Sequence, residues 1–288
     1  MTSIFSAYTA LFSGTDGGDA AVFNAYVDAA NGEGGQDVFT LNNGGGTITM
    51  GAGNDALFVN GGSVNSVDMG TGNDTVFMND GATAGTMDLG EGVNLFSGGN
   101  GGYIGTLFGG ADTDNVTLGN GAGTVDLGEG DNQLFAHGYV GSVTTGSGID
   151  NVQLHDGGGT IDLGAGDDIF RASGYVGEAY GGAGDDTFEM SAGGDFCGGE
   201  GDDTFAFDGT RMAATTEIWG STGSDTVNIE VDAIADFDDG RFATDMAAYA
   251  TTGEATLSQF NLTIHDVETV NVVADGVVIE TYDFGLFA

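Results

Sequence analysis

Short runs of alternating apolar and polar residues recur along most of the chain. In each run, an acidic or amide residue is followed two positions later by a large apolar residue. A further residue, apolar in most runs, follows after two more positions. Alternation with a period of two predicts a β-strand with one buried face. The first apolar positions, which we expect to point inward, are Phe39, Leu57, Val76, Phe96, Val116, Leu134, Val152, Phe170, Phe188, Phe205 and Val227.

A second short alternating segment follows within the same repeat. Residues 124–128 and 160–164 show it most clearly, and it predicts that Val125, Leu127, Ile161 and Leu163 also point inward. One repeat therefore comprises two short strands and two turns in about 18 residues.

A Gly-x-Gly-x-Asp motif, or a variant of it, precedes each first strand. Its last residues lie 17 to 22 positions apart, and the eleven copies end at Asp37, Asp55, Asp74, Asn94, Asp114, Asn132, Asp150, Asp168, Asp186, Asp203 and Asp225. A period this regular is typical of stacked coils that bury a continuous apolar column. We therefore predict an all-β fold, a parallel β-roll or β-solenoid of about eleven coils of 17–22 residues. Residues 1–31 are expected to form an N-terminal segment or cap, residues 32–229 the solenoid and residues 230–288 a β-rich C-terminal cap.

Charge is the strongest feature of the composition. The 288 residues include 44 Asp and Glu, three Lys and Arg and no proline, and the formal net charge is −41. Such a chain lacks the basic residues that bind nucleic acid or anionic lipid, so we expect neither partner and no membrane insertion. Hydrophobic residues make up 40% of the chain, enough to form a core. Cations from outside the chain are then needed to offset the repulsion among the carboxylates.

The turns contain the ligands that calcium prefers. Glycines allow tight corners and bring backbone carbonyls close to an ion, and the carboxylates supply further hard oxygens. The candidate metal ligands are Asp37, Gly51, Gly53, Asp55, Gly70, Gly72, Asp74, Asn94, Asp114, Asn132, Gly146, Gly148, Asp150, Gly164, Gly166, Asp168, Gly182, Gly184, Asp186, Gly199, Gly201, Asp203 and Asp225.

From about Gly32 to Val227 the repeats resemble the nonapeptide of the RTX (repeats-in-toxin) calcium-binding β-roll family. The resemblance implies calcium as the cofactor, with up to about ten ions. The opposite turns, such as NNGGG and HDGGG, largely lack the acidic residue. We therefore expect one calcium row along one edge, with weaker sites at Asn94 and Asn132.

Two further columns leave alternatives open. His137 and His155 are one repeat apart, which suits either a transition-metal site or a stacked polar ladder. Hydroxyl residues on the second strands form an outward column, which is either a solvated face or a surface for ice, mineral or bridging cations. Its members are Thr47, Ser66, Thr86, Thr106, Thr124, Ser142 and Thr160.

The ends of the chain differ from the repeats. Residues 270–279 predict a hairpin with an Asp-Gly turn, and residues 242–249 predict a short helix. The tail, residues 283–288, is similar to the C-terminal signals of type I secretion substrates. The N-terminus has neither the basic region nor the apolar run of a conventional signal peptide. These features together predict a secreted protein, extracellular or on the cell surface of a bacterium.

No HExxH, GxSxG or P-loop motif occurs, so we do not expect an enzyme. The sequence predicts an extracellular calcium-binding structural protein that folds on calcium and self-assembles through the ends of the solenoid. Its product would be a surface layer, filament or biofilm matrix fibre. Residues 1–12 are expected to dock on a neighbouring copy or, alternatively, to fold back over their own first coil. A monomeric adhesin, with a cell-surface polysaccharide as its partner, or an ice-binding module is the alternative function.

Overall fold

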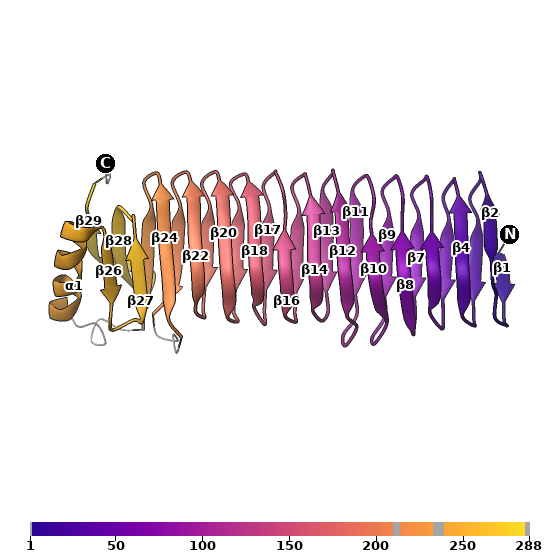
Figure 1. Ribbon diagram of the computed structural model, residues 1–288, viewed down its shortest axis with the longest axis horizontal. Coiled ribbons are helices and arrows are strands. Elements are labelled where there is room, and N and C mark those ends of the chain that lie inside the picture. Colours follow the sequence, from indigo (N-terminus) through magenta and orange to yellow (C-terminus); the bar gives the residue numbers. More distant parts are fainter. Residues whose placement is uncertain (1, 210–213, 233–238, 286–288) are drawn as a thin grey trace. The chain divides into compact units, whose positions relative to one another are not determined.

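The computed structural model describes residues 2–209, 214–232 and 239–285 (Figure 1). It contains two compact units, Met1–Gly146 and Ser147–Ala288. Within each unit, successive strands alternate between two parallel sheets, so that one turn of the chain adds one strand to each sheet. The predicted parallel β-solenoid is confirmed.

The first unit contains strands β1 to β16. One sheet has the spatial order β1 (Thr2–Phe5), β3 (Ala20–Phe23), β5 (Val38–Leu41), β7 (Ala56–Val59), β9 (Thr75–Met78), β11 (Asn94–Gly98), β13 (Asp114–Leu118) and β15 (Gln133–Ala136). The other has the order β2 (Phe12–Thr15), β4 (Val27–Glu33), β6 (Gly45–Thr49), β8 (Ser63–Asp68), β10 (Thr83–Asp88), β12 (Ile104–Gly110), β14 (Ala122–Gly128) and β16 (Val140–Thr144).

The second unit continues this pattern and ends differently. One sheet has the order β17 (Asn151–Leu154), β19 (Ile169–Ala172), β21 (Thr187–Met190), β23 (Thr204–Asp208), β25 (Thr226–Val231), β28 (Thr269–Ala274) and β29 (Val277–Asp283). The other has the order β18 (Gly158–Ala165), β20 (Val176–Ala183), β22 (Gly194–Glu200), β24 (Thr216–Thr222), β27 (Leu262–His265) and β26 (Glu254–Leu257). The last strand of each sheet, β29 or β26, is antiparallel to its neighbour.

Inward-facing side chains form the core as the alternation predicts. All eleven of the first apolar positions are at most 2% exposed, and Val125, Leu127, Ile161 and Leu163 are fully buried. Because equivalent residues pair in register, their side chains stack from coil to coil; Phe188 and Phe205, for example, have ring centroids 4.9 Å apart. The core is thus a ladder that no single coil could bury alone.

At the N-terminus, both sheets continue without interruption across residues 31 and 32, where the sequence predicted the boundary between the N-terminal segment and the solenoid. Strands β1 to β4 pair in parallel with the coils that follow, and residues 2–5 lie against β3 of their own chain. Paired strands therefore begin at Thr2.

At the C-terminus, β28 and β29 form the predicted hairpin, and Asp275 and Gly276 of its turn have φ angles of 52° and 72°. Helix α1 (Asp239–Thr252) is longer than predicted, and its Phe242 packs edge-on against Tyr282 of the last strand. Within the described residues, no helix has both the length and the apolar composition of a membrane span. Residues 286–288 of the secretion-like tail lie outside the described residues.

Candidate metal centre

The acidic and amide residues that end the turns form a column of buried side chains in each unit. All eleven predicted positions, from Asp37 to Asp225, are at most 2% exposed. The pairing of the strands that follow each turn brings these residues into register, one per coil. The structure therefore places the predicted residues in one row within each unit.

One side-chain oxygen of most row residues takes part in a regular hydrogen-bond ladder. The backbone N–H of a row residue donates to the Oδ1 atom of the row residue in the following coil, at 2.7 to 3.1 Å. The carboxylates are thus held in place by the backbone of the preceding coil. The ladder also explains why a side chain with an oxygen acceptor is needed at every step.

Two members of the row were missed in the sequence. Asp19 begins it, because its N–H donates to Asp37, and Glu268 ends it by accepting from the N–H of Asp225 at 2.8 Å. Asp19 follows a glycine-rich turn and precedes Ala21 and Phe23 at the expected spacing, so its signal was present. Glu268 was hidden because it lies 43 positions after Asp225, with α1 in between.

The second carboxylate oxygen has no comparable partner. The Oδ2 atoms are buried without a hydrogen bond at Asp37, Asp55, Asp74, Asp114, Asp168, Asp186, Asp203 and Asp225. Loss of solvent raises the pKa of Asp74, Asp114, Asp186 and Asp203 to about 7, although a backbone N–H on each carboxylate opposes the shift. The same cause raises the pKa of Asp168 and Asp225 to about 6. A buried carboxylate without a partner is costly, so each of these atoms needs a proton or a cation.

The two amide positions show what surrounds that second atom. The Nδ2 atom of Asn94 donates to the carbonyl oxygens of Gly92 and Gly90, at 2.8 and 3.3 Å. The Nδ2 atom of Asn132 donates to the carbonyls of Gly130 and Thr145, at 2.9 and 3.3 Å. Since Oδ1 of both residues occupies the same ladder as in the aspartates, Nδ2 stands where an aspartate has Oδ2. In an aspartate coil, an oxygen therefore faces carbonyl oxygens.

The glycines around this position leave room for an ion. A Cβ atom added at Gly109 would meet both Oδ2 of Asp114 and the carbonyl oxygen of Leu127 in the next coil. At Gly181 it would meet Oδ2 of Asp186 and the carbonyl of Gly198. All twelve glycines predicted as ligands have positive φ angles, which glycine adopts with little strain.

This donor set fits calcium. Calcium is bound by carboxylate and carbonyl oxygens, and both kinds converge beside Oδ2 of Asp114 and of Asp186. Among the described residues no group of three His, Cys, Asp or Glu side chains is arranged to hold a metal, so each candidate centre combines a carboxylate with backbone carbonyls. Asn94 and Asn132 already satisfy those carbonyls with an amide. For these two coils we expect no ion, where the sequence predicted weaker sites.

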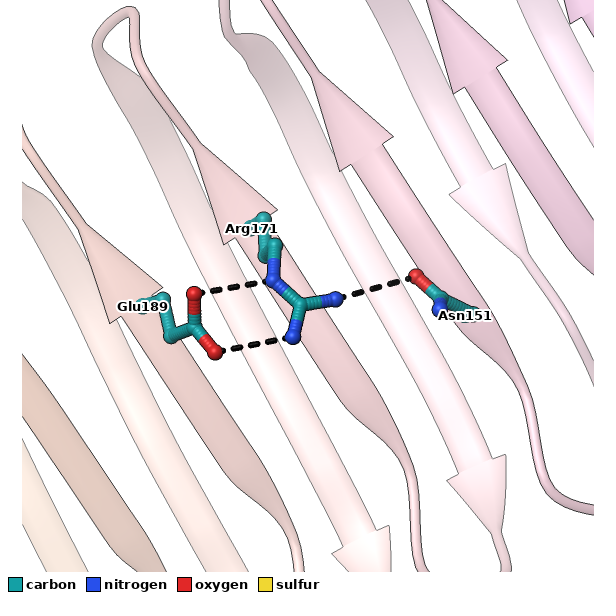
Figure 2. Close-up of polar contacts among 3 residues, drawn as sticks. All are labelled: Asn151, Arg171 and Glu189. Atoms are coloured by element: carbon teal, nitrogen blue, oxygen red, sulfur yellow. Dashed lines mark hydrogen bonds and ion pairs between the residues drawn. The ribbon is translucent and has the colours of Figure 1, made fainter.

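The other residues considered as ligands or counter-charges lie elsewhere. Arg171 forms a two-point contact with Glu189 on the outer face of the second unit, with both N–O distances at 2.8 Å, and reaches Asn151 at 3.5 Å (Figure 2). It therefore does not neutralise the buried row. His137 packs edge-on against Phe135, and on the same edge of the first unit Asn24, Asn42, Asn60 and Asn79 form a ladder of side-chain amides.

Replacing Asp186 by Asn is expected to lower the calcium concentration at which the protein folds. The amide keeps the bond from the N–H of Asp168 and supplies donors to the turn carbonyls, which should stabilise the calcium-free fold by about 1–3 kcal/mol. Asp186→Ala removes the acceptor for that N–H and supplies no donor to the carbonyls, so it should raise the calcium concentration at the midpoint of folding. Circular dichroism during a calcium titration measures this, with the exposed neighbour Asp185→Asn as the control. Equal shifts for the Asn and Ala variants would show that the amide does not take the place of the ion at the turn carbonyls.

Stability without calcium should fall as the pH rises. A carboxyl whose pKa is higher in the folded than in the unfolded chain stabilises the fold fully below about pH 4. That contribution is lost as the pH passes through 6 to 7, where Asp74, Asp114, Asp168, Asp186, Asp203 and Asp225 have their folded pKa. The thermal midpoint in calcium-free buffer should therefore be higher at pH 5 than at pH 8, and saturating calcium should remove the difference. A calcium-free midpoint that increases from pH 5 to pH 8 would contradict the burial of these groups.

Comparison with known proteins supports the fold. No protein-family model and no curated protein sequence matches the chain, so the RTX resemblance stays a prediction. A solved structure, described as a hyperactive, Ca²⁺-dependent, β-helical antifreeze protein from an Antarctic bacterium, is similar with a TM-score of 0.65 and 20% sequence identity. The match covers 97% of this chain and 94% of that one. The chain therefore shares its β-helical fold with a protein that depends on calcium.

Proposed function

We propose that the chain is an extracellular, calcium-dependent structural protein of a bacterium, which folds on calcium and assembles with further copies of itself. The observation that carries the first part is the row of buried Oδ2 atoms, each facing carbonyl oxygens. Ions that bind only the folded chain stabilise it by mass action. Without them, the net charge of −41 opposes the compact state. The proposal is non-enzymatic, because the sequence has none of the catalytic motifs considered above.

The open edge at the N-terminus supports assembly. Within the described residues, strands β1 and β2 each pair with one other strand, and Ile4, Tyr8 and Leu11 around them are 62–69% exposed. An unpaired strand edge is a template for another strand. At the other end, β29 also has one neighbour and exposes Val277 and Val278. We propose that β1 of one copy meets β29 of the next, which gives an open polymer through a heterologous contact.

Calcium should cause folding and association together, and a charge on the edge should block association alone. We expect Ile4→Lys to weaken polymerisation at least about tenfold, since charged edge residues prevent strand pairing. Sedimentation velocity and circular dichroism, with calcium and with excess chelator, measure the two steps. Val93→Lys, at an exposed apolar position in a turn, is the matched control. A full β spectrum in chelator contradicts the calcium part, whereas polymers of unchanged length from Ile4→Lys contradict the contact.

Ice binding is the second candidate, because the outward hydroxyl column is regular. In the first unit Thr47, Ser66, Thr86, Thr106, Thr124 and Ser142 pair in register, at the strand spacing of about 4.8 Å. Gly85, Gly105, Gly123 and Gly141 directly precede four of them, so no bulky side chain stands beside the column at these coils. The similar solved structure is that of an antifreeze protein.

If this face binds ice, a bulky residue in the column should remove most of the activity. Thr106→Tyr breaks the row at its middle, and Thr117→Tyr on the other sheet is the control. Thermal hysteresis in saturating calcium is the measurement. Ice binding through this column is wrong if the native protein has no hysteresis or if both variants retain it.

A further inference from the structure

A hollow of about 300 Å³ lies on the outer face of the second unit, over strands β20, β22 and β24. Tyr180, Cys197 and Trp219 line it and occupy one row, since Tyr180 pairs with Cys197 and Cys197 with Trp219. The two aromatic residues are thus two coils apart, about 9.6 Å along the row, with the small thiol side chain between them. The row forms two aromatic walls and a low floor.

The indole ring of Trp219 presents one face to this hollow. Its other side is covered by His265 in the next coil, with ring centroids 5.0 Å apart and planes within 6° of parallel. Because the stack follows the direction from coil to coil, the remaining face of the indole points back over Cys197 towards Tyr180. An aromatic face carries negative electrostatic potential and attracts cations.

Carboxylates form the side of the hollow. Glu178 and Asp195 line it and pair in register in the adjacent row, and Glu217 continues that row in the next coil. The hydroxyl of Tyr180 donates to Oε2 of Glu178 at 3.0 Å, which ties one aromatic wall to a carboxylate. The ion pair that Arg171 makes is with Glu189, on the other sheet.

A serine stands at the rim where the two preceding coils have glycine. Ser221 pairs with Gly199 and has a φ angle of 83°, which is unfavourable for a residue with a side chain. Its Oγ atom lies 3.4 Å from Sγ of Cys197. The strained position brings a hydroxyl over the floor of the hollow.

We propose that this hollow binds an organic cation, an alkylated ammonium group. Aromatic faces next to carboxylates favour a positive charge that is weakly hydrated, and a quaternary ammonium is stabilised by ring faces without needing hydrogen-bond acceptors. Calcium prefers six or more oxygen ligands, whereas two aromatic rings and a thiol stand among the few side chains that line this hollow. A neutral ligand would contact the aromatic rings but would gain no electrostatic attraction from the carboxylates of Glu178, Asp195 and Glu217. This site is separate from the buried row of aspartates.

Trp219 is the only tryptophan in the chain, so its fluorescence reports on the hollow directly. The folded protein in saturating calcium is titrated with choline chloride, against sodium chloride at equal ionic strength. We expect a saturable change in emission. The neutral isostere 3,3-dimethylbutan-1-ol should bind at least about tenfold more weakly, because it lacks the charge that the rings and carboxylates attract. Equal responses to choline and its isostere, or no response to choline, would overturn the proposal.

Variants separate the two parts of the site. Glu178→Gln should weaken choline binding about three- to tenfold and leave the response to the isostere unchanged, and Tyr180→Ala should weaken both. Asp126→Asn, on the same face of the first unit, is the control and should change neither. Choline binding that is insensitive to Glu178→Gln and Tyr180→Ala would show that it occurs elsewhere. Vesicles of phosphatidylcholine carry the same group on a surface, and binding to them beyond that of free choline would identify lipid as its source.

Discussion

The structure depends on one constraint: the carboxylates that end the turns are buried and stacked in register from coil to coil. Coils about 4.8 Å apart place one acidic side chain above the next, and burial removes the water that would separate their charges. The ladder from backbone N–H to Oδ1 fixes the position of each carboxylate. It leaves Oδ2 beside carbonyl oxygens, where a negative charge is least stable. Every coil of this kind has to resolve that conflict.

The chain contains two solutions. In the coils of Asn94 and Asn132 an amide donates to the carbonyls, so the coil satisfies its own polar groups. In the aspartate coils the solution must come from outside, either as a proton at low pH or as a cation at neutral pH. An asparagine coil is therefore independent of the ions around it, whereas an aspartate coil makes folding respond to calcium. The proportion of the two along the chain therefore sets how strongly folding is coupled to the ion.

Much of the fold could be predicted, because each coil repeats the same local pattern. Phe39, Phe96 and Phe188 lie in the core since they stand two positions after the acidic residue, and the glycines of the turns have the positive φ angles that such corners need. The helix and the hairpin near the C-terminus were also visible locally. What the sequence could not provide was the direction of each carboxylate, because the choice between Oδ1 and Oδ2 depends on the neighbouring coil.

Contacts between residues of neighbouring coils that differ in length could not be predicted from the sequence either. Glu268 joins the row only because α1 and its flanking residues are inserted between β25 and β27. Tyr180, Cys197 and Trp219 are 17 and 22 residues apart, and only the register of β20, β22 and β24 shows that they share one row. Residues 1–31 were predicted as an N-terminal segment or cap from their place before the first recognised motif, and the parallel pairing of β2 with β4 and of β3 with β5 is visible only in the structure.

The most direct measurement is a crystal structure of the calcium-bound protein with anomalous diffraction to locate the ions. We expect a calcium peak beside Oδ2 of the aspartates, within bonding distance of turn carbonyls, and no peak beside Asn94 or Asn132. Peaks of equal height in the aspartate and asparagine coils would contradict this expectation. A calcium role in folding would also be contradicted if no peak lay beside the row and the protein were still folded at neutral pH.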